Sequence, residues 1–176
     1  MRYLRIGFLM VFGAALLIVP NGIRLAASDS DVVQQAKDKH EIEALMWKYA
    51  RALDTLNADA YVSCYTPDGQ FVAGGNPTAG ADALRKMITD LKTRRDEQIA
   101  KGETPAPMYH MEMNTYVEFP AKDRARHHSY WQTVFGGVGR GSQPRVAAAG
   151  HAVDDLVKVN GKWLIKIRNV APGSSD

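Results

Sequence analysis

The chain has 176 residues, which is enough for one domain with a substantial core and does not suggest two. Its formal net charge is +3, but residues 1–28 hold three arginines and no acidic residue, so the rest of the chain is formally neutral. This balance excludes the basic footprint typical of nucleic-acid-binding proteins. Cys64 is the only cysteine, which excludes an internal disulfide and a thiolate metal site.

The N-terminus has the pattern of a secretory signal peptide. Two arginines in Met1–Arg5 precede 14 apolar and small residues, Ile6–Val19, and Ala26-Ala27-Ser28 offers small residues to a signal peptidase. The apolar run is shorter than the roughly 20 residues that a membrane span needs. We therefore expect residues 1–28 to be a signal peptide and the protein to be exported, periplasmic or secreted. Contact with a membrane is then expected only through the leader before cleavage.

The next segment has the apolar periodicity of one helix face and is expected to end at Asp54. The residues that repeat at this spacing are Ile42, Leu45, Met46, Tyr49 and Leu53. Residues 29–38 are polar and fit either a flexible lead-in or the first turns of this helix; we assign them as a lead-in. The folded domain is then residues 39–171, with residues 172–176 as a tail.

Asn57 can cap a second, short helix that is expected to carry Tyr61 and Tyr65 and to bury Cys64. The segment 66–69 predicts a turn, and a strand is expected to begin at Gln70. Residues 81–101 have the pattern of another helix, whose charged second half is expected to be solvated.

From Met108 onward the apolar period changes to two, which is typical of strands. The strands are expected at 108–119, 125–135, 145–159 and 162–170. Asn160-Gly161 predicts a tight hairpin between the last two. Helices followed by consecutive strands indicate an α+β fold, in which the helices cover one face of a curved antiparallel or mixed sheet.

These residues carry a resemblance to a known family. The segments YARALDTLNADAYVSCYTPDG, GHAVDD and NGKW, together with His110 and Asn114 on one strand, resemble the SnoaL-like branch of the nuclear transport factor two-like superfamily. The resemblance spans roughly residues 39–170. It implies a cone-shaped fold around an apolar pocket, in a superfamily that includes dehydratases, isomerases, epoxide hydrolases and proteins that only bind or dimerise. The fold therefore does not fix the reaction.

The resemblance to scytalone dehydratase implies roles for single residues. Asp54 matches an aspartate that orients a histidine and water, and His110 matches a histidine that begins the strand after the second long helix. The second histidine of that enzyme would fall near Phe135, so its role is vacant or has moved to His127 or His128. Leu53 and Ala152 stand where the family has aromatic residues, whereas Asp154 of the strand pattern is kept.

The residue types themselves favour acid–base chemistry. A neutral imidazole can remove a proton next to a carbonyl or hydroxyl-bearing carbon, and a carboxylate on its other nitrogen fixes the tautomer. Tyr49 and Tyr65 can donate to a developing enolate or a leaving hydroxide. Strand alternation places His110, Glu112 and Asn114 on one face, which either lines the pocket or meets water.

Several of these side chains also have plain structural explanations. His127 and His128 cannot both point inward; alternation favours His127, and a bulge would favour His128. Tyr65 and Trp131 more often belong to a core than to a ligand site. We nevertheless expect Tyr49, Tyr65, Asn114, Trp131 and Asp154 to contact substrate.

The sequence thus predicts a cofactor-independent lyase, such as a dehydratase, or an isomerase. Its catalytic residues would be Asp54, His110 and either His127 or His128, acting on a small hydrophobic, hydroxylated, cyclic or aromatic substrate. The alternative is a non-catalytic binding or dimerisation domain. We expect no metal and no cofactor, and a homodimer formed through the sheet. An epoxide hydrolase is favoured less, because no Asp-Arg-Asp constellation is evident in the sequence.

Overall fold

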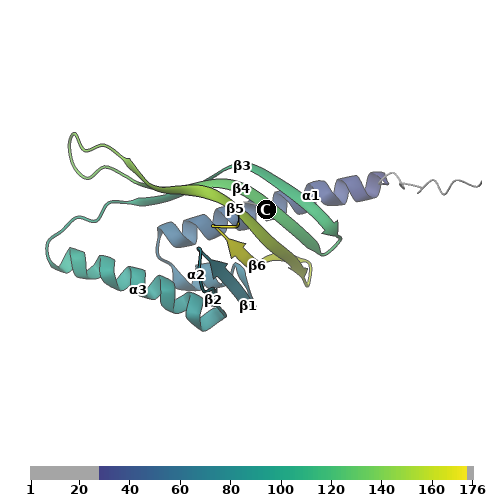
Figure 1. The fold of residues 1–176 in the computed structure, drawn as a ribbon, viewed down its shortest axis with the longest axis horizontal. Helices are drawn as coiled ribbons and strands as arrows, with labels where there is room; N and C mark the ends of the chain where they lie inside the picture. Colours follow the sequence, from purple (N-terminus) through teal and green to yellow (C-terminus); the bar gives the residue numbers. More distant parts are fainter. Residues whose placement is uncertain (1–27, 174–176) are drawn as a thin grey trace, which may run out of the picture.

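The computed structural model describes residues 28–173, and within this range it has three helices beside one six-stranded sheet (Figure 1). The helices are α1 (Asp29–Asp54), α2 (Ala58–Val62) and α3 (Ala81–Ala100). The strands are β1 (Tyr65–Val72), β2 (Thr78–Ala79), β3 (Met108–Ala121), β4 (Arg124–Phe135), β5 (Arg145–Val159) and β6 (Lys162–Asn169). None of the helices in the described range is long and apolar enough to cross a membrane. The predicted signal peptide lies outside the described residues, apart from Ser28.

The sheet has the order β2-β1-β6-β5-β4-β3. The neighbours pair antiparallel except β1 and β6, which run parallel, so the sheet is mixed. Asn160 and Gly161 join β5 to β6 with positive φ angles of 49° and 78°, the backbone that a tight hairpin turn requires. The predicted α+β class and the four long strands are confirmed.

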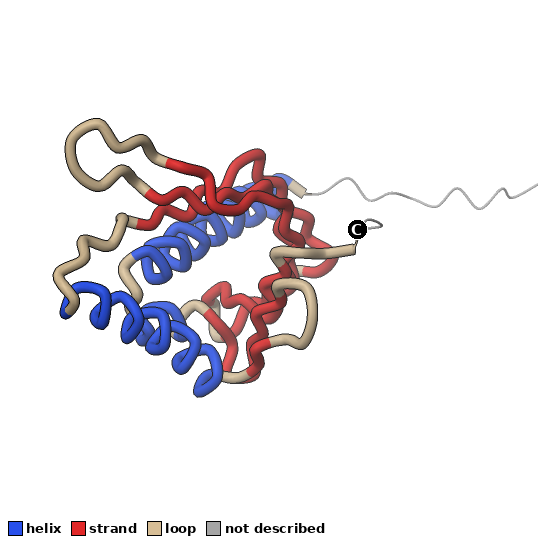
Figure 2. Tube along the Cα trace, turned by 60° about the vertical axis from the view of Figure 1, so that its left-hand side comes forward, coloured by secondary structure: helices blue, strands red, loops and turns tan. Residues whose placement is uncertain are grey.

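The sheet curves around α1, which runs beneath β3 to β5 (Figure 2). Helix α2 contacts both α1 and α3 and so lies between them. Between these layers lies a core of buried apolar side chains. Its fully buried members include Ile42 from α1, Leu84 and Ile88 from α3, and Ile165 from β6. The curvature brings side chains from strands at both ends of the sheet toward one interior.

The predicted flexible lead-in is instead the first part of α1. Ser28 caps the helix by accepting a hydrogen bond from the backbone N–H of Asp31, and two acidic residues in the first turn complement the helix dipole. Asp38 then fixes this part of α1 to the sheet. Its carboxylate accepts hydrogen bonds from Trp163 Nε1 at 3.0 Å and from Lys158, and its side chain is buried.

Tyr65 belongs to β1 rather than to the short helix that was expected to carry it. That helix ends at Val62. The carbonyl of Cys64 accepts a hydrogen bond from the backbone N–H of Ile165 on β6, so pairing with the sheet replaces helical hydrogen bonds there. The expected turn at 66–69 is an irregularity within β1, between the pairs Tyr65–Ile165 and Gln70–Ile167. Cys64 is buried as expected, and burial raises the pKa of its thiol to about 11.

We predict that Asp38→Ala lowers the free energy of unfolding by about 2 kcal/mol, because the buried Trp163 N–H loses its acceptor and Lys158 loses its partner. Burial opposes ionisation of Asp38, but hydrogen bonds from Lys158 and Trp163 prevail and lower its pKa. The folded-state pKa therefore lies below the unfolded value, so this stabilisation is present above about pH 4 and is lost as the pH falls.

The measurement is urea unfolding at pH 7 and at pH 3, with the exposed Asp82→Ala as the control on α3. The difference in unfolding free energy between wild type and Asp38→Ala should be smaller at pH 3 than at pH 7. An equal difference at both values would contradict the role given to the ionised carboxylate.

Candidate active site

A cavity of about 210 Å³ lies inside the curve of the sheet. Helix α1, the strands β1 and β3 to β6, and the residues that follow β1 and β6 all contribute to its wall. The lining residues are Tyr49, Leu53, Phe71, Ala73, His110, Met111, Glu112, Trp131, Thr133, Ala148, Arg168 and Val170. Most of this wall is apolar, and its ionisable groups come from His110 and Glu112 on β3, Arg168 on β6 and the phenol of Tyr49.

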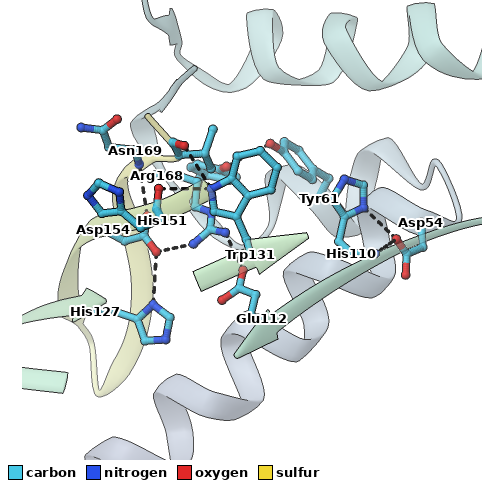
Figure 3. Close-up of polar contacts among 12 residues, drawn as sticks. Asp54, Tyr61, His110, Glu112, His127, Trp131, His151, Asp154, Arg168 and Asn169 are labelled. Atoms are coloured by element: carbon cyan, nitrogen blue, oxygen red, sulfur yellow. Dashed lines mark hydrogen bonds and ion pairs between the residues drawn. The ribbon is translucent and has the colours of Figure 1, made fainter. Parts of the chain in front are cut away.

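Asp54 and His110 meet at one end of this region (Figure 3). The Oδ1 atom of Asp54 accepts a hydrogen bond from the backbone N–H of His110 at 2.9 Å and lies 2.8 Å from its ring Nδ1. Asp54 is almost completely buried at the end of α1, where Arg51 also approaches its Oδ2 at 3.4 Å. One carboxylate therefore fixes both the backbone and the ring of His110.

This contact determines which nitrogen of His110 can act as a base. An ionised carboxylate only accepts hydrogen bonds, so Nδ1 carries the proton and donates a hydrogen bond to Asp54. In the neutral ring Nε2 then holds the free lone pair. Since His110 lines the cavity, the contact gives the arrangement of a base oriented by a buried acid.

A second polar cluster centres on Arg168, whose side chain is 3 % exposed. Its guanidinium donates through Nη1 to Asp154 Oδ2 and through Nη2 to Glu112 Oε1, the latter at 2.6 Å. The guanidinium carbon lies 4.9 Å from the centre of the Tyr49 ring, in a cation–π contact. Figure 3 shows how the cluster continues from Asp154 to His127, where Nδ1 lies 3.2 Å from Oδ2.

Burial and charge set the ionisation of this cluster. Burial would lower the pKa of Arg168, but the neighbouring carboxylates of Asp154 and Glu112 raise it well above its usual value, so the guanidinium stays charged. Burial raises the pKa of Glu112 more than Arg168 lowers it. Burial also raises the pKa of Tyr49, so its hydroxyl stays a hydrogen-bond donor at neutral pH.

A second cavity, of about 420 Å³, lies between α1 and β3. Its wall shares His110, Met111 and Glu112 with the first cavity and adds His127, Met46 and Trp47 among others. His110 and Glu112 therefore border both spaces. Within residues 28–173, no group of three or more His, Cys, Asp or Glu side chains is placed to hold a metal ion.

Three of the predicted site residues line the 210 Å³ cavity: His110, Tyr49 and Trp131. The indole N–H of Trp131 donates to the backbone carbonyls of His151 and Val170, so only its ring is free to contact a ligand. Gly150 lies opposite this indole, and a Cβ there would come within 3.0 Å of it. The glycine therefore makes room for the aromatic wall.

Other predicted residues lie away from the cavity. Tyr65 is buried, and its hydroxyl lies 3.0 Å from that of Tyr61, so it belongs to the core. Asp154 is fully buried and occupied by Arg168, His127 and the backbone N–H of Asn169, which leaves no oxygen toward the cavity wall. Asp154 therefore acts on Arg168 rather than on a ligand.

The two histidines of β4 face opposite ways, and His127 is the inner one, as strand alternation predicted. His128 lies on the outer face beside Tyr116. Asn114 also lies outside, contrary to the expected shared face with His110. Its φ of 52° and a register shift between Met113 and Tyr116 form a bulge that turns the side chain away.

Sequence reasoning missed Arg168 as a functional residue. Alternation along β6 puts Trp163 and Ile165 inside and would put Arg168 outside, but a register shift between Ile165 and Ile167 reverses the faces. Glu112 could have been assigned to the site from the sequence, because strand alternation places it on the same face as His110. The acid–arginine–acid arrangement that the sequence did not reveal is thus present as Asp154, Arg168 and Glu112, although Asp154 is withdrawn from the cavity.

The fold is shared with solved structures that are distant in sequence. A variant of a Mycobacterium tuberculosis protein of unknown function is 23 % identical, with a TM-score of 0.66 over 82 % of this chain and 78 % of that one. A Novosphingobium aromaticivorans protein with the provisional name scytalone dehydratase is 21 % identical, with a TM-score of 0.61 over 78 % and 85 %. A Catenulispora acidiphila protein in complex with S-DNPA is 21 % identical, with a TM-score of 0.61 over 76 % and 92 %.

These identities support a common fold and no more. Among curated proteins, no relative was found. The family model of the SnoaL-like domain matches residues 34–169, which is most of the chain. The resemblance inferred from the helix ending in Asp54 and from the last hairpin is thereby confirmed, and the protein belongs to the SnoaL-like domain family.

Proposed function

We propose that the protein is a cofactor-independent acid–base enzyme, a lyase of the dehydratase type or an isomerase. The observation that carries this proposal is the 2.8 Å contact between Asp54 Oδ1 and His110 Nδ1, with His110 on the wall of a mostly apolar cavity. A domain that only binds ligands has no need of a buried carboxylate that orients a cavity histidine.

The chemistry follows from the position of each group. His110 Nε2 removes a proton from carbon, and Asp54 stabilises the imidazolium that forms. In a dehydration the C–H electron pair becomes the new double bond and hydroxide leaves with a proton supplied by the site. In an isomerisation the proton returns to another carbon. Tyr49, on the same wall, can donate to the developing oxyanion.

The size and lining of the cavity support a small hydrophobic ring as substrate. A buried apolar cavity of about 150 Å³ accommodates benzene, so the 210 Å³ here suits one ring with substituents or a compact fused pair. Phe71 and Trp131 supply aromatic walls, and the ionisable groups on the same wall suit a hydroxyl or carbonyl substituent. A non-catalytic binding domain would have a cavity of the same size and lining, but it would not need a histidine oriented to act as a base.

We predict that His110→Gln lowers turnover about 10²–10⁴-fold, the usual contribution of a general base. The assay is conversion of a panel of hydroxylated bicyclic ketones and alcohols, followed by ultraviolet absorbance and mass spectrometry. Asp54→Asn should also lower turnover. In ¹⁵N spectra of the wild type we expect His110 to be a single Nδ1–H tautomer, and in the Asp54→Asn variant we expect that preference to be lost.

Asp59→Asn is the matched control, because Asp59 is exposed and pairs with Arg85 outside the cavity. If no compound is converted and the tautomer of His110 is the same in wild type and Asp54→Asn, the acid–base assignment fails. A ligand-binding domain would then be the better description.

We also propose that two copies pair through the outer face of β3, β4 and β5. Large apolar side chains are exposed there, including Tyr116 at 60 % and Tyr130 at 58 %. Their strands are adjacent, with Tyr116 opposite His128 and Tyr130 opposite Met113. A contiguous exposed apolar face of this kind is typical of an interaction site.

Tyr130→Arg is therefore expected to convert a dimer into a monomer, because it places a charge within the apolar interface. The mass is measured by light scattering during size-exclusion chromatography. Val33→Arg on α1, also at an exposed apolar residue, should leave the mass unchanged. A wild type that is already monomeric at about 100 µM would refute the dimer, since stable interfaces bind more tightly than that.

Export of the protein rests on the leader pattern in residues 1–28 and is proposed on that basis. Expression of the full chain in a bacterium should yield periplasmic protein whose intact mass corresponds to cleavage after Ser28. Leu16→Arg, which interrupts the apolar run, should retain the uncleaved chain in the cytoplasm. A wild-type mass that includes Met1 would disprove cleavage.

A further inference from the structure

A third cavity, of about 430 Å³, lies between the second half of α3, the start of β3 and the end of β4. Its lining residues all differ from those of the two cavities that border His110. The second half of α3 extends past α2 (Figure 1), and the buried residues of this helix, Leu84 and Ile88, both lie in its first half. The second half of α3 thus presents one face to this cavity rather than to the core.

The floor of the cavity is apolar. Its apolar side chains, all buried or half-buried, are Leu56, Leu91, Met108 and Phe135. Leu56 belongs to the core, Leu91 and Met108 pack against the core, and Phe135 is the strand partner of Met108. Because these side chains do not protrude, a single small molecule can reach them, whereas a flat membrane surface cannot.

Three cations border the same cavity. Arg94 and Arg95 belong to α3, and Lys101 follows at its C-terminal end. Within residues 28–173 none of these three side chains forms an ion pair, and the wall of the cavity holds one carboxylate, that of Glu97. The cavity therefore has an excess of positive charge at its rim.

The other basic residues of α3 differ in this respect, because each is paired with an aspartate. The pairs are Arg85–Asp59, Lys86–Asp90 and Lys92–Asp96. The unpaired positive charge of the helix is thus concentrated where the helix borders the cavity. Arg145 lies close by, with its guanidinium carbon 5.0 Å from the centre of the Phe135 ring. A positive rim above an apolar floor is complementary to an anion with an apolar body.

The shape of the wall favours an elongated ligand. From Leu91 to Lys101 the lining residues of α3 recur at the spacing of one helix face, over about 15 Å of helix. We propose that this cavity binds a free, linear amphipathic carboxylate, a medium-chain fatty acid. Its chain lies along the apolar floor, and its carboxylate accepts hydrogen bonds from the cations of the rim, for which arginine is well suited. This second ligand site goes beyond the proposed function and does not depend on it.

The experiment compares octanoate with 1-octanol, which has the same chain and no charge, and with acetate, which has the charge and no chain. Binding is followed in spectra of the purified protein labelled with ¹³C at the methionine methyl groups. Met108 lines this cavity, whereas Met111 lines both of the others. Octanoate should shift the signal of Met108 and not that of Met111. It should bind about tenfold more tightly than either comparison ligand, because only octanoate combines a charged hydrogen bond with apolar burial.

The combined variant Arg94→Gln and Arg95→Gln tests the rim. It should weaken octanoate binding about tenfold and leave 1-octanol binding unchanged, since it removes charge and keeps the apolar floor. The matched control combines Lys86→Gln and Lys92→Gln, which removes two charges from the same helix outside the cavity. This control should bind octanoate as the wild type does. The comparison of ligands on the wild type decides the matter even if the arginine variant does not fold.

The inference is overturned if octanoate and 1-octanol bind equally, if octanoate shifts Met111 instead of Met108, or if Met108 is unmoved at millimolar octanoate. It is also overturned if the arginine variant binds octanoate as tightly as the wild type. Binding to phosphatidylglycerol vesicles that requires Arg94 and Arg95, with Met108 unmoved by octanoate, would assign these cations to a lipid surface instead. His110→Gln should bind octanoate normally, so the result is separate from the fate of the proposed enzyme.

Discussion

The buried charge of Arg168 is the constraint on which the interior depends. A guanidinium removed from water is tolerated only where carboxylates and hydrogen bonds replace its hydration. Here Asp154 from β5 and Glu112 from β3 supply the carboxylates, and Tyr49 from α1 covers the flat face. The first helix, the edge strand and two inner strands are therefore tied to a single group, and the cavity is the space that remains beside it.

This arrangement divides the cavity between two kinds of chemistry. His110 and Glu112 stand two residues apart on β3 and face the same interior, but their partners differ. Asp54 orients the ring of His110, while Arg168 and burial act in opposite directions on the Glu112 carboxyl. One strand thus presents an imidazole and a carboxyl group, each with a different partner, to the same small space.

Much of the fold followed from the sequence, because periodicity reports burial directly. The apolar positions of α1, the change to a period of two after Met108, and Asn160-Gly161 each had one simple structural explanation. The start of α1 was missed because its first turns are held by Asp38, whose partners Lys158 and Trp163 lie about 120 residues further along the chain. Ser28 and the acidic residues of the first turn are local helix-start signals, but no local pattern reveals the contacts that fix Asp38 to the sheet.

The site was predictable only where the strands stay regular. His110, His127 and Glu112 lie on the faces that alternation gives them, whereas Asn114 and Arg168 each follow a shift in strand register. Such a shift in register is hardly visible in the local sequence, yet it moves every later side chain of the strand to the other face. At Asn114 it removed a polar group from the cavity, and at Arg168 it brought one in. The polarity of this interior is therefore decided by two irregularities of the sheet as much as by the residues themselves.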